Sequence, residues 1–211
     1  MIRFIYADQL SQHPVLAESM FRDRAAQFKD RLDWDVTVDE NGWEVDEYDA
    51  LNPLYVVWED PCGRHGGSVR ILPTVGRTMT NEHFLDLTGG VVIRSPLIWE
   101  CTRFCLAPDA PVGVAGALLA AGVELGLRFG LEQALGVIYS KTLPIYRRIG
   151  SAPDVIGSRG EGRDEISVGL WEISEARRAE ISRRCGIPLS VIARWFDASF
   201  PPHLAEDRVA A

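Results

Sequence analysis

The 211 residues fit one domain of ordinary size, and 46% hydrophobic with 25% charged residues is the composition of a globular chain rather than a disordered one. The 22 basic and 30 acidic residues give a net charge of −8, which argues against nucleic acid or an anionic membrane as a partner. The start MIRFIYADQL lacks the features of a signal peptide, and the apolar run from Val112 to Leu127 contains Glu124. We therefore expect a single cytoplasmic domain spanning 1–211, either a monomer or a weak dimer.

In the first half of the chain, periodicity and turn residues predict strands and helices in alternation. The expected elements are a strand over Ile2–Tyr6, a helix over Pro14–Arg31, an acidic loop over Asp33–Asp49, hairpin strands over Leu54–Trp58 and Ser68–Leu72, and a short helix over Thr80–Leu87 with Asn81 as its cap.

The second half continues the alternation. A strand begins at Leu97, and it is followed by a helix over Pro111–Gly130, a strand over Ala134–Ser140, a helix over Leu143–Ile149, a strand over Ile166–Trp171, and helices over Ser174–Cys185 and Ser190–Phe196. This order predicts an α/β fold, a mixed sheet with helices on both faces. The chain contains neither GxGxxG nor GxxxxGK[ST], so Rossmann and P-loop enzymes are not expected.

The four cysteines, at positions 62, 101, 105 and 185, form no CxxC pair and have no histidine at ligand spacing. We therefore expect reduced, buried thiols and no zinc or other metal site.

The strand LIWECTRFCLAP has an interior composition but carries Glu100 and Arg103. Burying either charge without a partner costs several kcal/mol, on the order of 3–5. Residues three apart point to opposite faces of a regular strand, so the two can share a cleft only if the strand bulges. We predict a bulge near Cys101–Phe104, whose freed N–H groups could stabilise an oxyanion.

Other charged and aromatic residues could join this pair. Each has an ordinary explanation, because helical arginines are usually solvated, acidic pairs form turns, and aromatic residues fill cores. Arg70, Glu100 and Arg103 nevertheless lie in interior-type strands and need partners. We expect three arginines to meet three acids beside a cleft: Arg24, Arg70 and Arg103 with Asp46, Asp49 and Glu100.

The whole set resembles the signature of the LuxI-type acyl-homoserine-lactone synthases, the autoinducer synthases of quorum sensing. The residues that carry the resemblance are Arg24, Phe28, Trp34, Asp46, Asp49, Arg70, Phe84, Glu100 and Arg103, in FRDRAAQFKDRLDW, EVDEYD, GGSVRILPT and WECTRFC. The later YRRIG resembles the C-terminal half of the family more loosely.

This resemblance implies a fold related to the GCN5-type N-acyltransferases, with a strongly twisted mixed sheet and a V-shaped cleft. It implies two substrates, S-adenosylmethionine and an acyl thioester on acyl carrier protein or coenzyme A, and no cofactor. The amine of S-adenosylmethionine would be acylated, and its carboxylate would then close the lactone and release methylthioadenosine. Residues 1–109 would hold S-adenosylmethionine and the catalytic part, and residues 110–211 the acyl pocket and carrier docking.

Roles follow from the resemblance and from the chemistry. An amine attacks only when neutral, so a carboxylate should take its proton, with Glu100 the first choice and Asp46 the second. The S-adenosylmethionine site would comprise Arg24, Phe28, Trp34, Phe84 and Arg103, and Asp49 with Arg70 would form a structural ion cluster.

The acyl pocket is expected between the strand over 134–140 and the helix over 143–149, lined by Trp99, Tyr139, Leu143 and Tyr146. Family members that prefer 3-oxo chains carry Ser or Thr at the position aligned with Tyr139, so we expect an acyl group without that substituent. Arg147, Arg148, Arg159 and Arg163 form a basic concentration. Arg147 and Arg148 are expected to dock the anionic carrier.

Two alternatives remain open. One is a generic acetyltransferase using acetyl-coenzyme A, although LAPDAPVGVAG lacks the usual glycine and basic spacing of a pyrophosphate loop. The other is a non-catalytic binding module, in which the ion cluster only fixes the N-terminal loop to the sheet.

Overall fold

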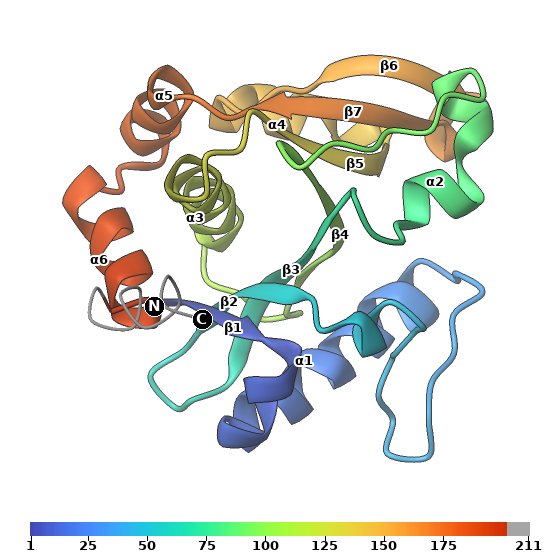
Figure 1. The fold of residues 1–211 in the computed structure, drawn as a ribbon. Coiled ribbons are helices and arrows are strands. Elements are labelled where there is room, and N and C mark those ends of the chain that lie inside the picture. The colour runs from blue at the N-terminus through green and yellow to red at the C-terminus, as the bar shows by residue number, and fades with distance from the viewer. Residues whose placement is uncertain (202–211) are drawn as a thin grey trace, which may run out of the picture.

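In the described part of the chain, seven strands form one mixed sheet in the order β1-β2-β3-β4-β5-β7-β6 (Figure 1). The structure is a computed structural model that describes residues 1–201, so the last ten residues of the predicted domain lie outside the described part. Every neighbouring pair is antiparallel except β4 and β5. The strands are β1 (Ile2–Tyr6), β2 (Leu54–Glu59), β3 (His65–Pro73), β4 (Ile98–Leu106), β5 (Gln133–Tyr139), β6 (Asp154–Arg159) and β7 (Ile166–Glu172).

Helices cover both faces of this sheet, as the sequence predicts (Figure 1). They are α1 (Pro14–Ala25), α2 (Met79–His83), α3 (Val114–Arg128), α4 (Leu143–Ile149), α5 (Glu175–Cys185) and α6 (Leu189–Ser199). The predicted helix over 14–31 is α1 followed by a π-helical turn over Ala26–Arg31. The prediction that Asn81 caps a helix is wrong, because α2 starts after Thr78 and the Asn81 side chain bonds the backbone of Ile93.

Alternation along the strands builds two apolar layers. Ile2, Phe4, Leu54 and Val56 pack with α3 and α6 on one face. Ile5, Tyr55 and Val57 pack with α1 on the other face. The apolar run that starts at Val112 becomes α3, a buried helix, and no helix within residues 1–201 combines the length and hydropathy needed to cross a bilayer.

Among the strands within residues 1–201, β6 is the one that the periodicity does not predict. It lies at the edge of the sheet, most of its side chains are exposed, and it therefore lacks an apolar alternation. Gly157 allows the segment Leu85–Thr88 to cover this edge, because a Cβ there would lie 1.9 Å from the carbonyl oxygen of Leu87. The ion pair between Arg159 and Asp86, at 2.7 Å, holds the same contact.

Candidate active site

The sheet opens between its two parallel strands. Only residues 98–100 of β4 pair with residues 133–135 of β5, and beyond them the strands separate (Figure 1). A cavity of about 1060 Å³ occupies this opening and is lined by both strands, by α3 and α4, and by the segment after α1. The V-shaped cleft that the resemblance implies is therefore present.

The predicted bulge lies in β4. Ser68 pairs with Cys105 and Arg70 pairs with Thr102, so β4 carries one more residue than β3 between the two pairs. Arg103 takes the left-handed conformation there, with φ of 52°. This conformation costs a non-glycine residue on the order of 1–3 kcal/mol, so the surrounding contacts must hold it.

Arg24 enters the site from α1 and is 1% exposed. Its Nε donates to Glu44 at 2.7 Å, and its two terminal nitrogens donate to Asp49 at 3.0 and 2.9 Å. Burial opposes the ionisation of Asp49, but the charge of Arg24 and its hydrogen bonds outweigh burial and hold the pKa of Asp49 well below its usual range. The Tyr55 hydroxyl also donates to Asp49, at 2.5 Å.

Arg70 points to the face of β3 that carries α1, opposite to its neighbours Val69 and Ile71. It forms a bidentate pair with Asp46 at 2.5 and 2.9 Å, and its Nε donates to Thr102 at 3.0 Å. It also lies 2.9 Å from Asp49. Bidentate pairs of this kind fix geometry as well as charge.

Arg103 completes the cluster from the bulge. Its guanidinium lies 2.9 Å from Glu44 and 2.9 Å from Asp46. The same group stands 5.5 Å from the centre of the Phe28 ring, a cation–π contact. The strained residue is therefore held by two carboxylates and an aromatic ring.

Three arginines thus meet three acids, and the predicted meeting of Arg24, Arg70 and Arg103 with Asp46 and Asp49 is confirmed. The third acid is Glu44 rather than the predicted Glu100. Glu44 is 0% exposed and joins Arg24 to Arg103. The sequence around Glu44 gives no local signal of this role, because its partners Arg24 and Arg103 are brought to it only by the fold.

Glu100 is also buried, at 1% exposure, but its carboxylate has backbone partners. It accepts hydrogen bonds from the N–H groups of Met79 and Thr80, at 3.0 and 2.6 Å, where α2 begins. Burial raises the pKa of Glu100, and these hydrogen bonds and the charge of Arg70 offset part of the effect. Met79 is part of the cavity lining, whereas Glu100 is not.

The predicted aromatic residues line the cavity together: Phe28, Trp34, Phe84 and Tyr139. Phe28 and Trp34 stack with ring centres 4.9 Å apart, and the Trp34 N–H donates to the Tyr139 hydroxyl at 2.7 Å. Phe28 and Trp34 were predicted for the S-adenosylmethionine site and Tyr139 for the acyl pocket, so the residues of the two predicted sites meet at this hydrogen bond.

The other predicted acyl-pocket residues differ in position. Tyr146 lines the cavity and packs on Trp171, and burial raises the pKa of Tyr146 to about 12. Trp99 is outside the lining and packs on Phe129 instead. It lies where β4 and β5 are still paired, so the sheet has no opening beside it. Leu143 is likewise outside the lining.

The predicted basic concentration is only partly available to a ligand. Arg147 and Arg148 are exposed on α4, and neither guanidinium forms an ion pair within residues 1–201. Arg163 is exposed as well, but Arg159 is already paired with Asp86.

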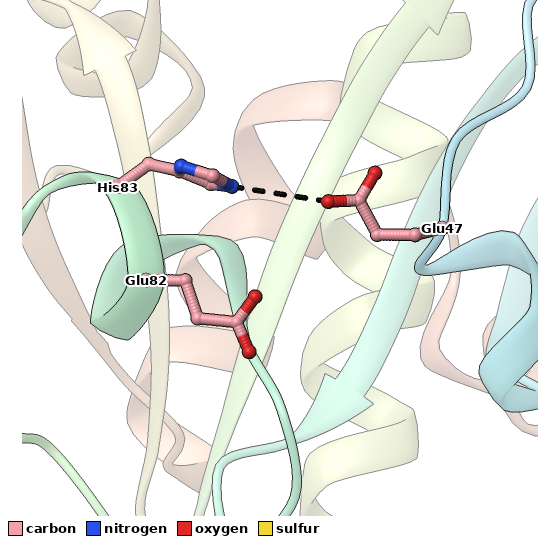
Figure 2. A group of neighbouring side chains, drawn as sticks. All are labelled: Glu47, Glu82 and His83. Atoms are coloured by element: carbon pink, nitrogen blue, oxygen red, sulfur yellow. Dashed lines mark ion pairs between the residues drawn. The ribbon is translucent and has the colours of Figure 1, made fainter.

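Within residues 1–201, one set of three side chains lies close enough together to hold a metal ion: Glu47, Glu82 and His83, all exposed (Figure 2). Figure 2 shows His83 and Glu82 on α2, with the His83 ring directed at Glu47. The Nε2 of His83 lies 4.0 Å from Oε1 of Glu47. Glu82 accepts from Arg77 at 2.7 and 2.8 Å and from Tyr48 at 2.8 Å, and these bonds lower the pKa of Glu82 to about 2. These contacts join α2 to the acidic loop at the cavity.

The cysteines are free thiols, but the prediction that all are buried is wrong. Cys105 is buried, Cys101 and Cys185 are half-buried, and Cys62 is exposed. Burial raises the pKa of both Cys101 and Cys105 to about 12, which disfavours the reactive thiolate.

Comparison with known proteins agrees with this geometry. The family model described as autoinducer synthase matches residues 8–181. An acyl-homoserine-lactone synthase of Rhizobium etli is 39% identical over 196 residues, which cover 87% of this chain and 91% of that protein.

Solved structures agree as well. The CoA-dependent acyl-homoserine lactone synthase MesI superposes with a TM-score of 0.80 at 24% identity, covering 89% of this chain and 96% of that one. BjaI, a second CoA-dependent synthase, was solved with S-adenosylmethionine and isopentyl-CoA. It superposes with a TM-score of 0.79 at 25% identity, covering 92% of this chain and 98% of that one. The chain therefore belongs to the acyl-homoserine-lactone synthases, the autoinducer synthase family of acyltransferases.

Proposed function

We propose that this synthase joins S-adenosylmethionine to an acyl-CoA thioester in the cavity between β4 and β5. The amine nitrogen attacks the thioester carbonyl, an amide forms, and the thiol of coenzyme A leaves. The carboxylate of the same substrate then attacks its γ-carbon, which closes the lactone and breaks the bond to the sulfonium, releasing methylthioadenosine. The observation that carries this proposal is one cavity with a charged, aromatic side and an apolar side.

S-adenosylmethionine would bind on the charged side. The stacked rings of Phe28 and Trp34, with Phe84, offer aromatic faces to its sulfonium or adenine. Arg103 lines the cavity and would hold the carboxylate. The donors of Arg24 are occupied by Glu44 and Asp49, so we assign Arg24 to holding the acidic loop in place rather than to direct contact.

A carboxylate would accept the proton that the attacking amine loses. Asp46 lines the cavity, but its oxygens already accept from Arg70, from Arg103 and from two backbone N–H groups. Burial raises the pKa of Glu100, which suits a proton acceptor, although Glu100 is outside the cavity lining. We propose Glu100 as the base, acting through a water, with Asp46 second.

The bulge in β4 would bind the carbonyl oxygen of the thioester. Thr102, Arg103 and Phe104 all line the cavity, and the extra residue interrupts the ladder to β3 at this point. Backbone N–H groups freed there would stabilise the oxyanion of the tetrahedral intermediate.

The acyl chain would extend along the apolar side of the cavity, against Leu118, Gly122, Val123, Tyr146 and Trp171. The anionic end of the donor would meet the exposed Arg147 and Arg148. In this proposal residues 1–109 hold S-adenosylmethionine and residues 110–211 hold the acyl donor, the division that the resemblance implies. The donor is proposed as acyl-CoA because BjaI was solved with isopentyl-CoA.

A purified-enzyme assay tests the donor. The same acyl group is supplied on coenzyme A and on acyl carrier protein with S-adenosylmethionine, and lactone and methylthioadenosine are measured by mass spectrometry. Faster turnover of the acyl-CoA supports the proposal. Faster turnover of the carrier-protein thioester would assign the chain to the other donor class.

A further inference from the structure

One hydrogen bond joins the segment after α1 to the end of strand β5. The indole N–H of Trp34 donates to the phenol oxygen of Tyr139 at 2.7 Å, and the residues lie 105 positions apart in the chain. Trp34 lies shortly after the π-helical turn that follows α1, whereas Tyr139 is the last residue of β5. Both side chains line the cavity.

This bond is one link in a chain of contacts that spans the splayed strands. Arg103 on β4 lies over the Phe28 ring at 5.5 Å, Phe28 stacks on Trp34 at 4.9 Å, and the Trp34 and Tyr139 rings are 5.9 Å apart. The two ends of this chain are the bulge of β4 and the end of β5, where the sheet no longer connects the two strands.

The position of the Tyr139 ring therefore depends on Trp34. A tyrosine at a strand end has several staggered side-chain positions, and the hydrogen bond selects one of them. Lys141 adds a cation–π contact on the same ring at 4.2 Å. The ring held in this position lines the cavity and lies against Trp34.

We propose that Trp34, a residue on the S-adenosylmethionine side, sets the acyl-chain selectivity of the enzyme by holding the Tyr139 ring in place. This inference rests on the proposed function, because it takes the apolar side of the cavity as the acyl site. Loss of the hydrogen bond frees the ring, and chains longer than the normal acyl group then gain room.

The test is the ratio of lactones in the medium of cells that express the protein and have no synthase of their own. The variants are Trp34→Phe, Tyr139→Phe and the double variant, and mass spectrometry measures the main lactone against the homologue two carbons longer. Each single variant should lower this ratio about 3- to 10-fold, the equivalent of one hydrogen bond, and the double variant should lower it no further.

Trp43→Phe is the matched control. Trp43 lies in the same acidic segment and also stacks on a phenylalanine, Phe21, at 5.3 Å, but it is not in the cavity lining and its N–H has no partner within residues 1–201. This variant should keep the wild-type ratio.

A Trp34 that only binds S-adenosylmethionine would lower the total yield and leave the ratio unchanged. Unchanged ratios in both single variants would overturn the inference, while lactones would still support the proposed function. If Trp34→Phe makes too little lactone to measure, Tyr139→Phe and Tyr139→Leu decide the matter. Tyr139→Leu must then lower the ratio of main to longer lactone more than Tyr139→Phe does. A wild-type ratio in either Tyr139 variant overturns the inference. No lactone from the wild type would instead contradict the proposed function.

Discussion

The carboxylate of Glu44 lies 2.9 Å from the guanidinium of Arg103, a residue 59 positions later in the chain. Its other oxygen accepts from Arg24 at 2.7 Å. One fully buried acid therefore ties α1 to the bulge of β4, and with it the S-adenosylmethionine side of the cavity to the sheet.

Glu44→Gln should be strongly destabilising. The substitution leaves Arg24 and Arg103 each short of a buried negative partner, and breaking a buried pair costs about 3–5 kcal/mol. Urea unfolding measures this loss. Glu18→Gln is the control, because the Glu18–Arg22 pair is more than half exposed and should change stability by less than about 1 kcal/mol. A Glu44→Gln protein as stable as this control would contradict the role given to Glu44.

Gly122 tests where the acyl chain runs. It lies in α3 and lines the cavity, and a Cβ built on it meets nothing within 4 Å. Gly122→Ala should stabilise the helix by up to about 1 kcal/mol, and Gly122→Leu should fill the apolar side. With purified enzyme, Gly122→Leu should lose activity with long acyl donors before short ones. Equal loss with all donors would place the chain elsewhere.

Gly126, one turn later in α3, gives the opposite expectation for stability. A Cβ there would lie 2.7 Å from Cγ2 of Ile173 and 3.1 Å from two more atoms of that side chain. Gly126→Ala should therefore cost about 1–3 kcal/mol from overpacking. Thermal unfolding of the two alanine variants compares them directly, and equal melting temperatures would contradict the packing described for α3.

Protonation of Asp49 should cause part of the loss of folding stability in acid. Arg24 lowers the pKa of folded Asp49 below the value of about 3.9 that an unfolded chain gives. A depressed pKa contributes stability that is complete above the unfolded value and is lost as the pH falls toward the folded one. Between pH 5 and 3, by urea unfolding, Asp49→Asn should lose less stability than the wild type. Parallel curves would show that Asp49 is not the group responsible.

Much of the site could be predicted from the sequence because buried charge needs partners. The cluster of Arg24, Arg70 and Arg103 with Asp46 and Asp49 followed from that rule, and the three-residue spacing of Glu100 and Arg103 predicted the bulge.

The rest depends on tertiary contacts that no local pattern records. The Glu44 bridge and the Trp34–Tyr139 bond each join segments that meet only in the fold. Trp99 was predicted to line the acyl pocket, but β4 and β5 separate only after it. Strand β6 is exposed at the sheet edge and so has no apolar period to detect.

The most direct test of the account is the activity of Glu100→Gln, measured as lactone formed from purified enzyme, with S-adenosylmethionine affinity measured by calorimetry on the same sample. A general base contributes about 100-fold or more, so the variant should bind S-adenosylmethionine nearly as the wild type does and acylate it at least about 100-fold more slowly. A folded Glu100→Gln enzyme with wild-type turnover would contradict the account.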